Sequence, residues 1–93
     1  MSTHRFAVNV TPKPGILDPQ GRAVEGSLRH LGIDGVSAVR VGRRVELTVE
    51  APDAESARAV VERLSSELLA NPLIEAYAIE AIAGASSAVS EAR

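Results

Sequence analysis

The 93-residue sequence predicts an α+β fold with the element order β-α-β-β-α-β. Apolar and polar residues alternate over residues 5–11 and 44–50, which is the period of a strand buried on one face. Over residues 19–31 and 54–70 the apolar residues recur every three or four positions, which is the period of a helix with one apolar face. Two helices on one face of an antiparallel four-stranded sheet make a two-layer sandwich, ferredoxin-like in outline.

The first predicted strand, residues 5–11, leads into a rigid connector, and residues 1–4 are expected to form a loose start. Pro12 and Pro14 end the strand because proline has no N–H to donate to a neighbouring strand. The connector carries Lys13, the only lysine of the chain. Its composition suits either a stiff link or a surface that docks a partner, and position and composition leave both interpretations open.

The first predicted helix runs from about Pro19 to Leu31. Asp18 is expected to be its N-cap, because the carboxylate can accept a backbone N–H that has no partner within the first turn. Gly32 predicts a left-handed end to the helix. The apolar residues of this helix form a narrow stripe: Val24, Leu28 and Leu31.

Residues 36–41 and 44–50 are expected to be two strands of a hairpin. Directly opposed residues share a face, so Val41 should oppose Val45. That pairing requires a three-residue loop, Gly42–Arg44, or a bulge. The pattern leaves the order of strands in the sheet open.

The second half of the chain predicts a helix and a final strand. Asp53 caps the helix, and Asn71-Pro72 ends it. Its apolar residues form a broad stripe: Ala57, Val60, Val61, Leu64 and Leu68. The final strand, residues 73–82, is apolar on both faces, which is typical of a strand covered on both sides. In a domain with two helices, we expect another subunit to supply the second cover.

Length and composition predict one domain over residues 1–83, followed by a disordered tail at 84–93. The chain has one Phe, one Tyr and no Trp, so Val, Leu, Ile and Ala must form the core, which favours self-association. A net charge of −2 with interspersed signs argues against nucleic-acid binding. No apolar run approaches the ~20 residues that span a bilayer, and no secretory signal begins the chain, so a cytoplasmic protein without a membrane partner is expected.

Candidate catalytic and metal-binding residues do not form a recognisable set. The chain has no cysteine, and His4 and His30 lie on separate predicted elements, so no metal site is expected. Glu46 and Glu50 lie on the exposed face of one strand, where solvated carboxylates are the simpler interpretation than an acid–base pair. The arginines at the predicted hairpin tip either keep it hydrated or bind an anion: Arg40, Arg43 and Arg44.

Three segments nevertheless carry motifs that occur together in a known family. They are Lys13–Gly21 (Lys-Pro-Gly-Ile-Leu-Asp-Pro-Gln-Gly), Val39–Arg43 (Val-Arg-Val-Gly-Arg) and Leu68–Tyr77, which contains Asn-Pro-Leu-Ile-Glu. In order and spacing, over about residues 5–82, they resemble the PurS family, the small subunit of phosphoribosylformylglycinamidine synthase. Arg43 stands where this family usually has lysine, which keeps the charge but changes the geometry of any contact.

The resemblance implies a subunit of an ATP-dependent ligase of de novo purine biosynthesis. That enzyme converts formylglycinamide ribonucleotide, glutamine and ATP to formylglycinamidine ribonucleotide, glutamate, ADP and phosphate. A glutaminase subunit releases ammonia, and a large synthetase subunit uses ATP and Mg²⁺. The small subunit forms dimers or tetramers, bridges the other two and supports ammonia transfer. The resemblance therefore implies no catalytic residue, cofactor or metal in this chain.

Two surfaces follow as expectations from the resemblance. A partner-docking surface is expected to contain Lys13, Gly15, Leu17, Asp18, Pro19, Gln20, Gly21, Arg40, Arg43, Asn71 and Pro72. Self-association is expected through the final strand, with Ile74, Tyr77, Ile79 and Ile82. The alternative is a stand-alone regulatory domain of ferredoxin-like shape that binds a small molecule at a dimer interface. An independent small enzyme that uses Glu46 or His30 ranks third.

Overall fold

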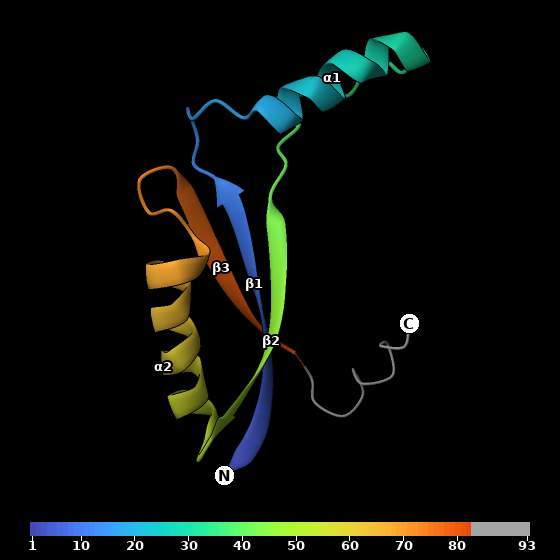
Figure 1. The fold of residues 1–93 in the computed structure, drawn as a ribbon. Helices are drawn as coiled ribbons and strands as arrows, with labels where there is room; N and C mark the ends of the chain where they lie inside the picture. The colour runs from blue at the N-terminus through green and yellow to red at the C-terminus, as the bar shows by residue number, and fades with distance from the viewer. Residues whose placement is uncertain (83–93) are drawn as a thin grey trace.

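The computed structural model describes residues 1–82 (Figure 1). Its elements are β1 (Ser2–Pro12), α1 (Pro19–Leu31), β2 (Arg43–Ala51), α2 (Ala54–Leu64), a π-helical segment η1 (Ser65–Leu69) and β3 (Glu75–Ile82). The strands form one antiparallel sheet of three strands in the order β2-β1-β3. The predicted α+β class is confirmed, and the predicted four-stranded sheet is wrong. The tail expected at 84–93 lies outside the described residues.

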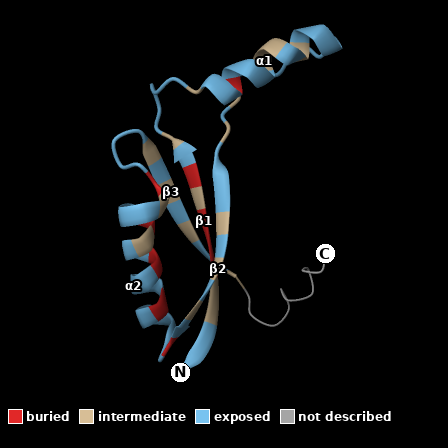
Figure 2. Cartoon of the chain, in the orientation of Figure 1, coloured by how far each residue is buried: buried red, intermediate tan, exposed pale blue. Residues whose placement is uncertain are grey.

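The core lies between α2 and one face of the sheet, and the central strand β1 supplies more of it than any other element. Phe6 lies opposite Leu47 on β2 and Ala81 on β3, so the register aligns the apolar faces of all three strands. The buried core cluster consists of Phe6, Val8, Val10, Ala51, Ala57, Val61 and Ala70. Figure 2 shows the buried positions gathered on β1 and on the side of α2 that faces the sheet.

Strand β1 begins earlier than the alternation predicts. Residues 2–4 pair with residues 49–51 of β2, and the Ser2 hydroxyl donates to the Ala51 carbonyl oxygen at 3.2 Å. The expected loose start at residues 1–4 is therefore wrong. The reason is that β2 is long enough to provide backbone partners for the polar residues that precede Phe6.

The predicted hairpin over residues 36–50 does not form. Arg43 and Arg44 belong to β2 and pair with Val10 and Asn9 of β1, so they are not turn residues. Residues 36–42 are irregular, because side-chain carboxylates take the backbone N–H groups that a neighbouring strand would otherwise bind. Val39 N donates to Glu25 Oε2 at 2.9 Å, and Val41 N donates to Asp18 Oδ2 at 2.8 Å.

Helix α1 has the predicted bounds and the predicted caps. Asp18 Oδ1 accepts a hydrogen bond from Gly21 N at 3.0 Å, and Gly32 is left-handed, with a φ of 71°. The helix projects from one end of the sheet instead of lying on its face (Figure 1), and it makes few contacts with the strands or with α2. The expectation that both helices cover one face is therefore wrong for α1. The Cα radius of gyration of 16.8 Å, compared with about 12 Å for a compact domain of this length, reflects this arm.

Helix α2 begins as predicted, with Asp53 accepting from Ser56 N at 2.7 Å. Only one side of its broad apolar stripe is buried. Val60 and Leu68 are 51% and 73% exposed. Segment η1 is wound more widely than an α-helix, because Ala70 N donates to Ser65 O, five positions earlier, at 3.0 Å. Its side chains therefore point in directions that differ from those of a continued α-helix. Within residues 1–82 neither helix has the length and hydropathy to cross a bilayer.

Candidate functional site

The three motif segments meet at one end of the sheet, although as many as 61 positions separate the contacting residues, as between Lys13 and Ile74. The first is joined to the third by Lys13. Its backbone N donates to the Ile74 carbonyl oxygen at 2.9 Å, and its Nζ donates to the Pro72 carbonyl oxygen at 2.6 Å. The lone lysine therefore fixes the connector against the turn that precedes β3. It retains two further N–H donors, because an ammonium group carries three.

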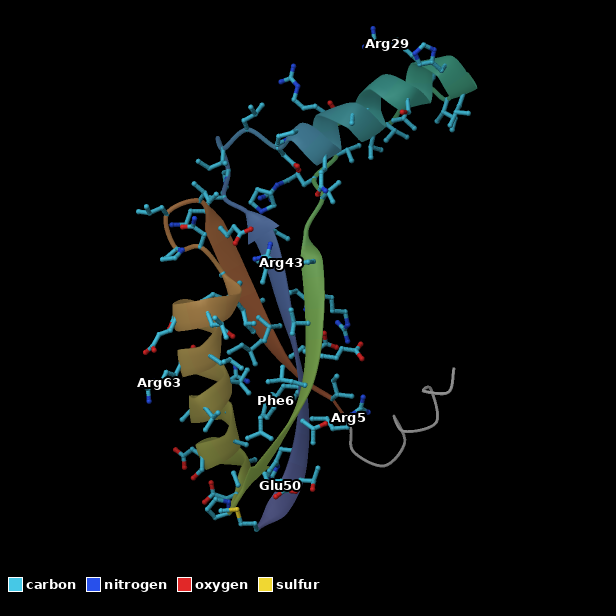
Figure 3. The ribbon with its side chains drawn as sticks, in the orientation of Figure 1. Arg5, Phe6, Arg29, Arg43, Glu50 and Arg63 are labelled. Carbon is cyan, nitrogen blue, oxygen red and sulfur yellow. The ribbon has the colours of Figure 1, made fainter. Side chains whose placement is uncertain are left out.

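Arg43 joins the second motif to the third. Its Nη1 and Nη2 donate to the two carboxylate oxygens of Glu75 at 2.8 and 3.0 Å, and Nη2 also donates to the Leu69 carbonyl oxygen at 2.6 Å. Glu75 in turn accepts a hydrogen bond from Asn71 N at 2.8 Å. A lysine could not form this two-pronged contact, so the arginine at this position has a geometric role within the chain. Figure 3 shows Arg43 at the end of the sheet where β1 and β2 part.

Acid is expected to weaken this end of the sheet through Glu75. The Arg43 guanidinium, and after it the Asn71 N–H, hold the pKa of Glu75 below its ordinary 4.5. The unfolded chain therefore takes up this proton first, so the stabilisation by Glu75 is complete above about pH 4.5 and is lost as the pH falls through the lowered folded value. We expect the urea midpoint to fall between about pH 5 and pH 3, and to fall less in Glu75→Gln.

Urea titrations at a series of pH values, followed by circular dichroism, measure this effect. Glu50→Gln is the matched control, because Glu50 is exposed and forms no side-chain hydrogen bond within the described residues. Hydrogen bonds also lower the pKa values of Asp18, Asp53 and Glu80. These carboxylates account for the part of the pH dependence of stability that remains in Glu75→Gln. If the urea midpoint fell equally with pH in the unaltered chain and in Glu75→Gln, Glu75 would not be a source of the acid sensitivity.

Asp18 joins the first motif to the second. One carboxylate oxygen caps α1 and the other binds Val41 N, and these two bonds, led by the one to Val41, lower the pKa of Asp18. Gly21 is buried directly beneath this contact. A Cβ there would collide with the Val39 carbonyl oxygen and lie 2.7 Å from Asp18 Oδ2, so only glycine allows the helix to approach residues 39–41 so closely.

A groove of about 700 Å³ lies over this junction, and we call it the docking groove. Its lining residues are Pro12, Ile16, Leu17, Asp18, Pro19, Gln20, Val41, Gly42, Arg43, Ile74 and Glu75. The apolar side chains on it are open to solvent, with Leu17 68%, Ile74 42% and Ile16 38% exposed. The charged side chains that line this groove, Asp18, Arg43 and Glu75, are hydrogen-bonded within the chain, whereas its apolar side chains are free to contact a partner.

The remaining predicted docking residues shape this region. Gly15 has a φ of 84°, which glycine adopts without strain, and it turns the connector so that Ile16 N donates to Lys13 O at 3.1 Å. Asn71 stabilises the turn before β3 by accepting from Leu73 N at 3.1 Å. Arg40 is exposed and forms no hydrogen bond within residues 1–82, so it alone among the predicted charged docking residues is uncommitted there.

The four residues expected to mediate self-association do not share one surface. Tyr77 and Ile79 pack against the core under α2, and the Tyr77 hydroxyl donates to Glu62 at 3.2 Å. Desolvation, and then this contact with Glu62, raise the pKa of Tyr77. Ile82 belongs to the opposite face of the sheet, and Ile74 lines the docking groove. Alternation alone could not assign these faces, because both are apolar in the sequence.

The structure gives His4 and Glu46 structural partners, whereas His30 and Glu50 are exposed and form no side-chain hydrogen bond within residues 1–82. His4 Nε2 lies 2.9 Å from the Ser2 hydroxyl, and Glu46 is paired with Arg44 at 3.0 Å. Arg44 also pairs with Glu80 at 2.9 Å, which extends the contact from β2 across β1 to β3. Among residues 1–82 no three His, Asp or Glu side chains gather closely enough to hold a metal ion.

Several residues of the site were not among the predicted docking residues, and Glu25 and Ile16 are two of them. Glu25 lies within a helix, and its bond to Val39, 14 positions away, leaves no periodic signal. Ile16 lies inside the first motif, but nothing in the sequence distinguishes it as a residue that lines a groove. The structure assigns both to the site because it places the connector and helix α1 next to residues 39–41.

Comparison with known proteins shows which family carries these three motifs. Residues 5–83 match the family model described as "PurS: Phosphoribosylformylglycinamidine (FGAM) synthase". The chain belongs to the PurS family. The PurS subunit of this synthase from Synechocystis sp. is 47% identical over 78 residues, which cover 84% of this chain and 78% of the relative.

Solved PurS structures share the fold. The structure of PurLQS from Thermotoga maritima contains a chain with a TM-score of 0.81 and 33% identity, over 88% of this chain and 100% of that one. PurS from Bacillus subtilis has a TM-score of 0.75 and 36% identity, over 86% of this chain and 99% of the other. The similarity spans the helices and the sheet, so the projecting α1 falls within the shared PurS architecture.

Proposed function

We propose that this PurS-family chain is the non-catalytic small subunit of FGAM synthase, an ATP-dependent ligase of de novo purine biosynthesis. The complex converts formylglycinamide ribonucleotide, glutamine and ATP to formylglycinamidine ribonucleotide, glutamate, ADP and phosphate. The observation that carries the proposal is the meeting of the three PurS motifs at one exposed groove. Residues that are far apart in sequence serve this one surface, which is the expected arrangement for a binding subunit.

In this proposal the chemistry belongs to the partner subunits. The large synthetase subunit binds ATP and Mg²⁺, the glutaminase subunit releases ammonia, and this chain holds the two in register for ammonia transfer in the cytoplasm. The relevant physical property is an ordered contact surface. Lys13, Asp18 and Arg43 fix the backbone around the docking groove before binding. Less conformational entropy is then lost when a partner binds.

The exposed apolar residues of the docking groove fit the energetics of a protein interface. Such interfaces have an apolar centre that carries most of the binding energy, surrounded by a polar rim. Leu17 and Ile74 supply an apolar centre, and Gln20 and Arg43 lie on the same groove as polar neighbours. This supports docking over the simple-connector interpretation of residues 10–21.

We further propose that the chain associates with itself through α1. A 13-residue helix with two glycines is marginal unless its apolar stripe is packed. Val24 and Leu31 on this stripe are 42% and 70% exposed, and Ile33 and Val36, which follow the helix, are 44% and 50% exposed. A second copy that covers these residues would complete the fold of the arm.

Reconstitution tests the proposal. The chain is mixed with the synthetase and glutaminase subunits, and glutamine-dependent formation of formylglycinamidine ribonucleotide is measured. We expect this activity to require the chain, while ammonia-dependent synthesis by the large subunit proceeds without it. Gel filtration of the chain alone is expected to give at least twice its mass of 9.7 kDa. Full glutamine-dependent activity without the chain would refute the bridging role, and a monomeric elution would refute self-association.

A further inference from the structure

A second groove, of about 540 Å³, lies beside the docking groove, and we call it the basic groove. The two share three lining residues, Ile16, Leu17 and Asp18, so the connector separates them and Leu17 borders both. Three cationic side chains line the basic groove, from the connector, the first turns of α1 and the irregular segment: Lys13, Arg22 and Arg40. They come together in a chain whose net charge is −2.

The carboxylates of the basic groove are already used. Asp18 directs one oxygen to Gly21 N and the other to Val41 N, and Glu25 directs Oε2 to Val39 N. The cations are less committed. The side chains of Arg22 and Arg40 are both exposed, and neither guanidinium group has a hydrogen bond or ion pair within residues 1–82. The groove therefore offers two guanidinium groups that form no ion pair within residues 1–82, next to an exposed leucine, although Arg40 is near enough to Asp18 to help lower the pKa of that carboxylate.

We infer that the partner surface that docks at Leu17 is acidic, and that its carboxylates bind Arg22 and Arg40 while an apolar pocket receives Leu17. This inference rests on the proposed function and specifies the chemistry of the partner. The planar guanidinium group binds a carboxylate through two parallel hydrogen bonds, which fixes orientation as well as attraction. Opposite charges on two docking surfaces also raise the rate at which they meet.

The shape of the basic groove favours a protein partner over a small anion. Small-molecule sites enclose most of the ligand surface, whereas both arginines here are exposed side chains on an open groove. The basic groove is also continuous with the apolar docking groove through Leu17. A single partner segment can therefore contact the apolar centre and the arginines together.

Charge reversal tests the inference. The double variant Arg22→Glu, Arg40→Glu is compared with Arg58→Glu, Arg63→Glu, which makes the same charge change at exposed positions of α2. We expect the first variant to bind the synthetase–glutaminase pair at least tenfold more weakly at low salt, with a flatter salt dependence. The α2 variant is expected to bind within twofold of the unaltered chain. Circular dichroism verifies folding, and Arg22→Gln, Arg40→Gln provides a milder version with a smaller loss.

Three results would overturn the inference, and they are distinguishable. Equal affinities for both double variants, with binding that does not respond to salt, would reject the acidic partner while leaving the bridging role intact. Absence of any complex with the unaltered chain would reject the proposed function as well. Binding of inorganic phosphate or ATP to the chain alone, lost in Arg22→Glu, Arg40→Glu, would identify the groove as a small-anion site instead.

Discussion

Replacing Gly42 by alanine is expected to destabilise the chain by about 1–3 kcal/mol, the usual cost of forcing extra atoms into a packed site. Gly42 lies where the irregular segment enters β2. A Cβ there would collide with the carbonyl oxygen of Val10 and lie 3.0 Å from Thr11 Cγ2. Val10 is buried and paired with Arg43 and Tyr77, so its backbone cannot move aside without disturbing the sheet.

Gly26→Ala is the matched control for this substitution. Gly26 lies inside α1, and nothing lies within 4 Å of a Cβ built on it. Alanine there is expected to stabilise the helix by about 0.5–1 kcal/mol, because it removes the conformational freedom of glycine in the unfolded chain. Urea unfolding followed by circular dichroism measures both variants. Effects of the same sign and size would show that Gly42 has no special packing requirement.

The substitution Leu17→Asp is expected to weaken binding to the partner subunits by about 30-fold or more, the loss typical of an interface hot spot. Leu17 is 68% exposed, so the stability of the free chain should change little. The loss arises because an aspartate would bring an unpaired carboxylate into an apolar, acidic partner surface. Glutamine-dependent synthesis at limiting concentrations of the chain should fall in parallel.

Leu68→Asp controls for the general effect of a new surface charge. Leu68 is 73% exposed, and it lies on η1. Calorimetric titration of each variant into the synthetase–glutaminase pair separates the two surfaces. If only Leu68→Asp lost affinity, the partner would bind on the outer side of α2 and η1, and the docking groove would not be its binding site.

The parts of the fold that the sequence predicted correctly depend on local signals. Helix α1 begins and ends at the predicted residues, because its cap, Asp18-Pro19, and its stop, Gly32, act within a few positions. Strand β2 and the start of α2 were likewise readable, from strict alternation and from the cap at Asp53. The caps of both helices act over four residues or fewer, and the alternation of β2 is visible in consecutive residues.

The errors concern contacts between distant residues. Val39 and Val41 alternate as strand residues do, but carboxylates 14 and 23 positions earlier in the chain bind their N–H groups. The pairing of Arg43 with Glu75 bridges 32 positions, so the arginine was read as a charge free to bind a partner. The motifs located the docking groove, and the contacts within it changed which residues are expected to carry the binding. Lys13, Asp18 and Arg43 fix the surface, while Leu17, and in our inference Arg22 and Arg40, contact the partner.

The projecting α1 also has a consequence for how the chain responds to its own abundance. Under the proposed self-association, the free energy that orders the arm comes from an encounter between copies, so it follows mass action. The sheet with α2 has a core of its own and is independent of concentration. In dilute solution the chain is then a folded body with a frayed arm, and the arm acquires a defined structure as copies accumulate. The amount of protein, together with the sequence, decides how much of it is folded.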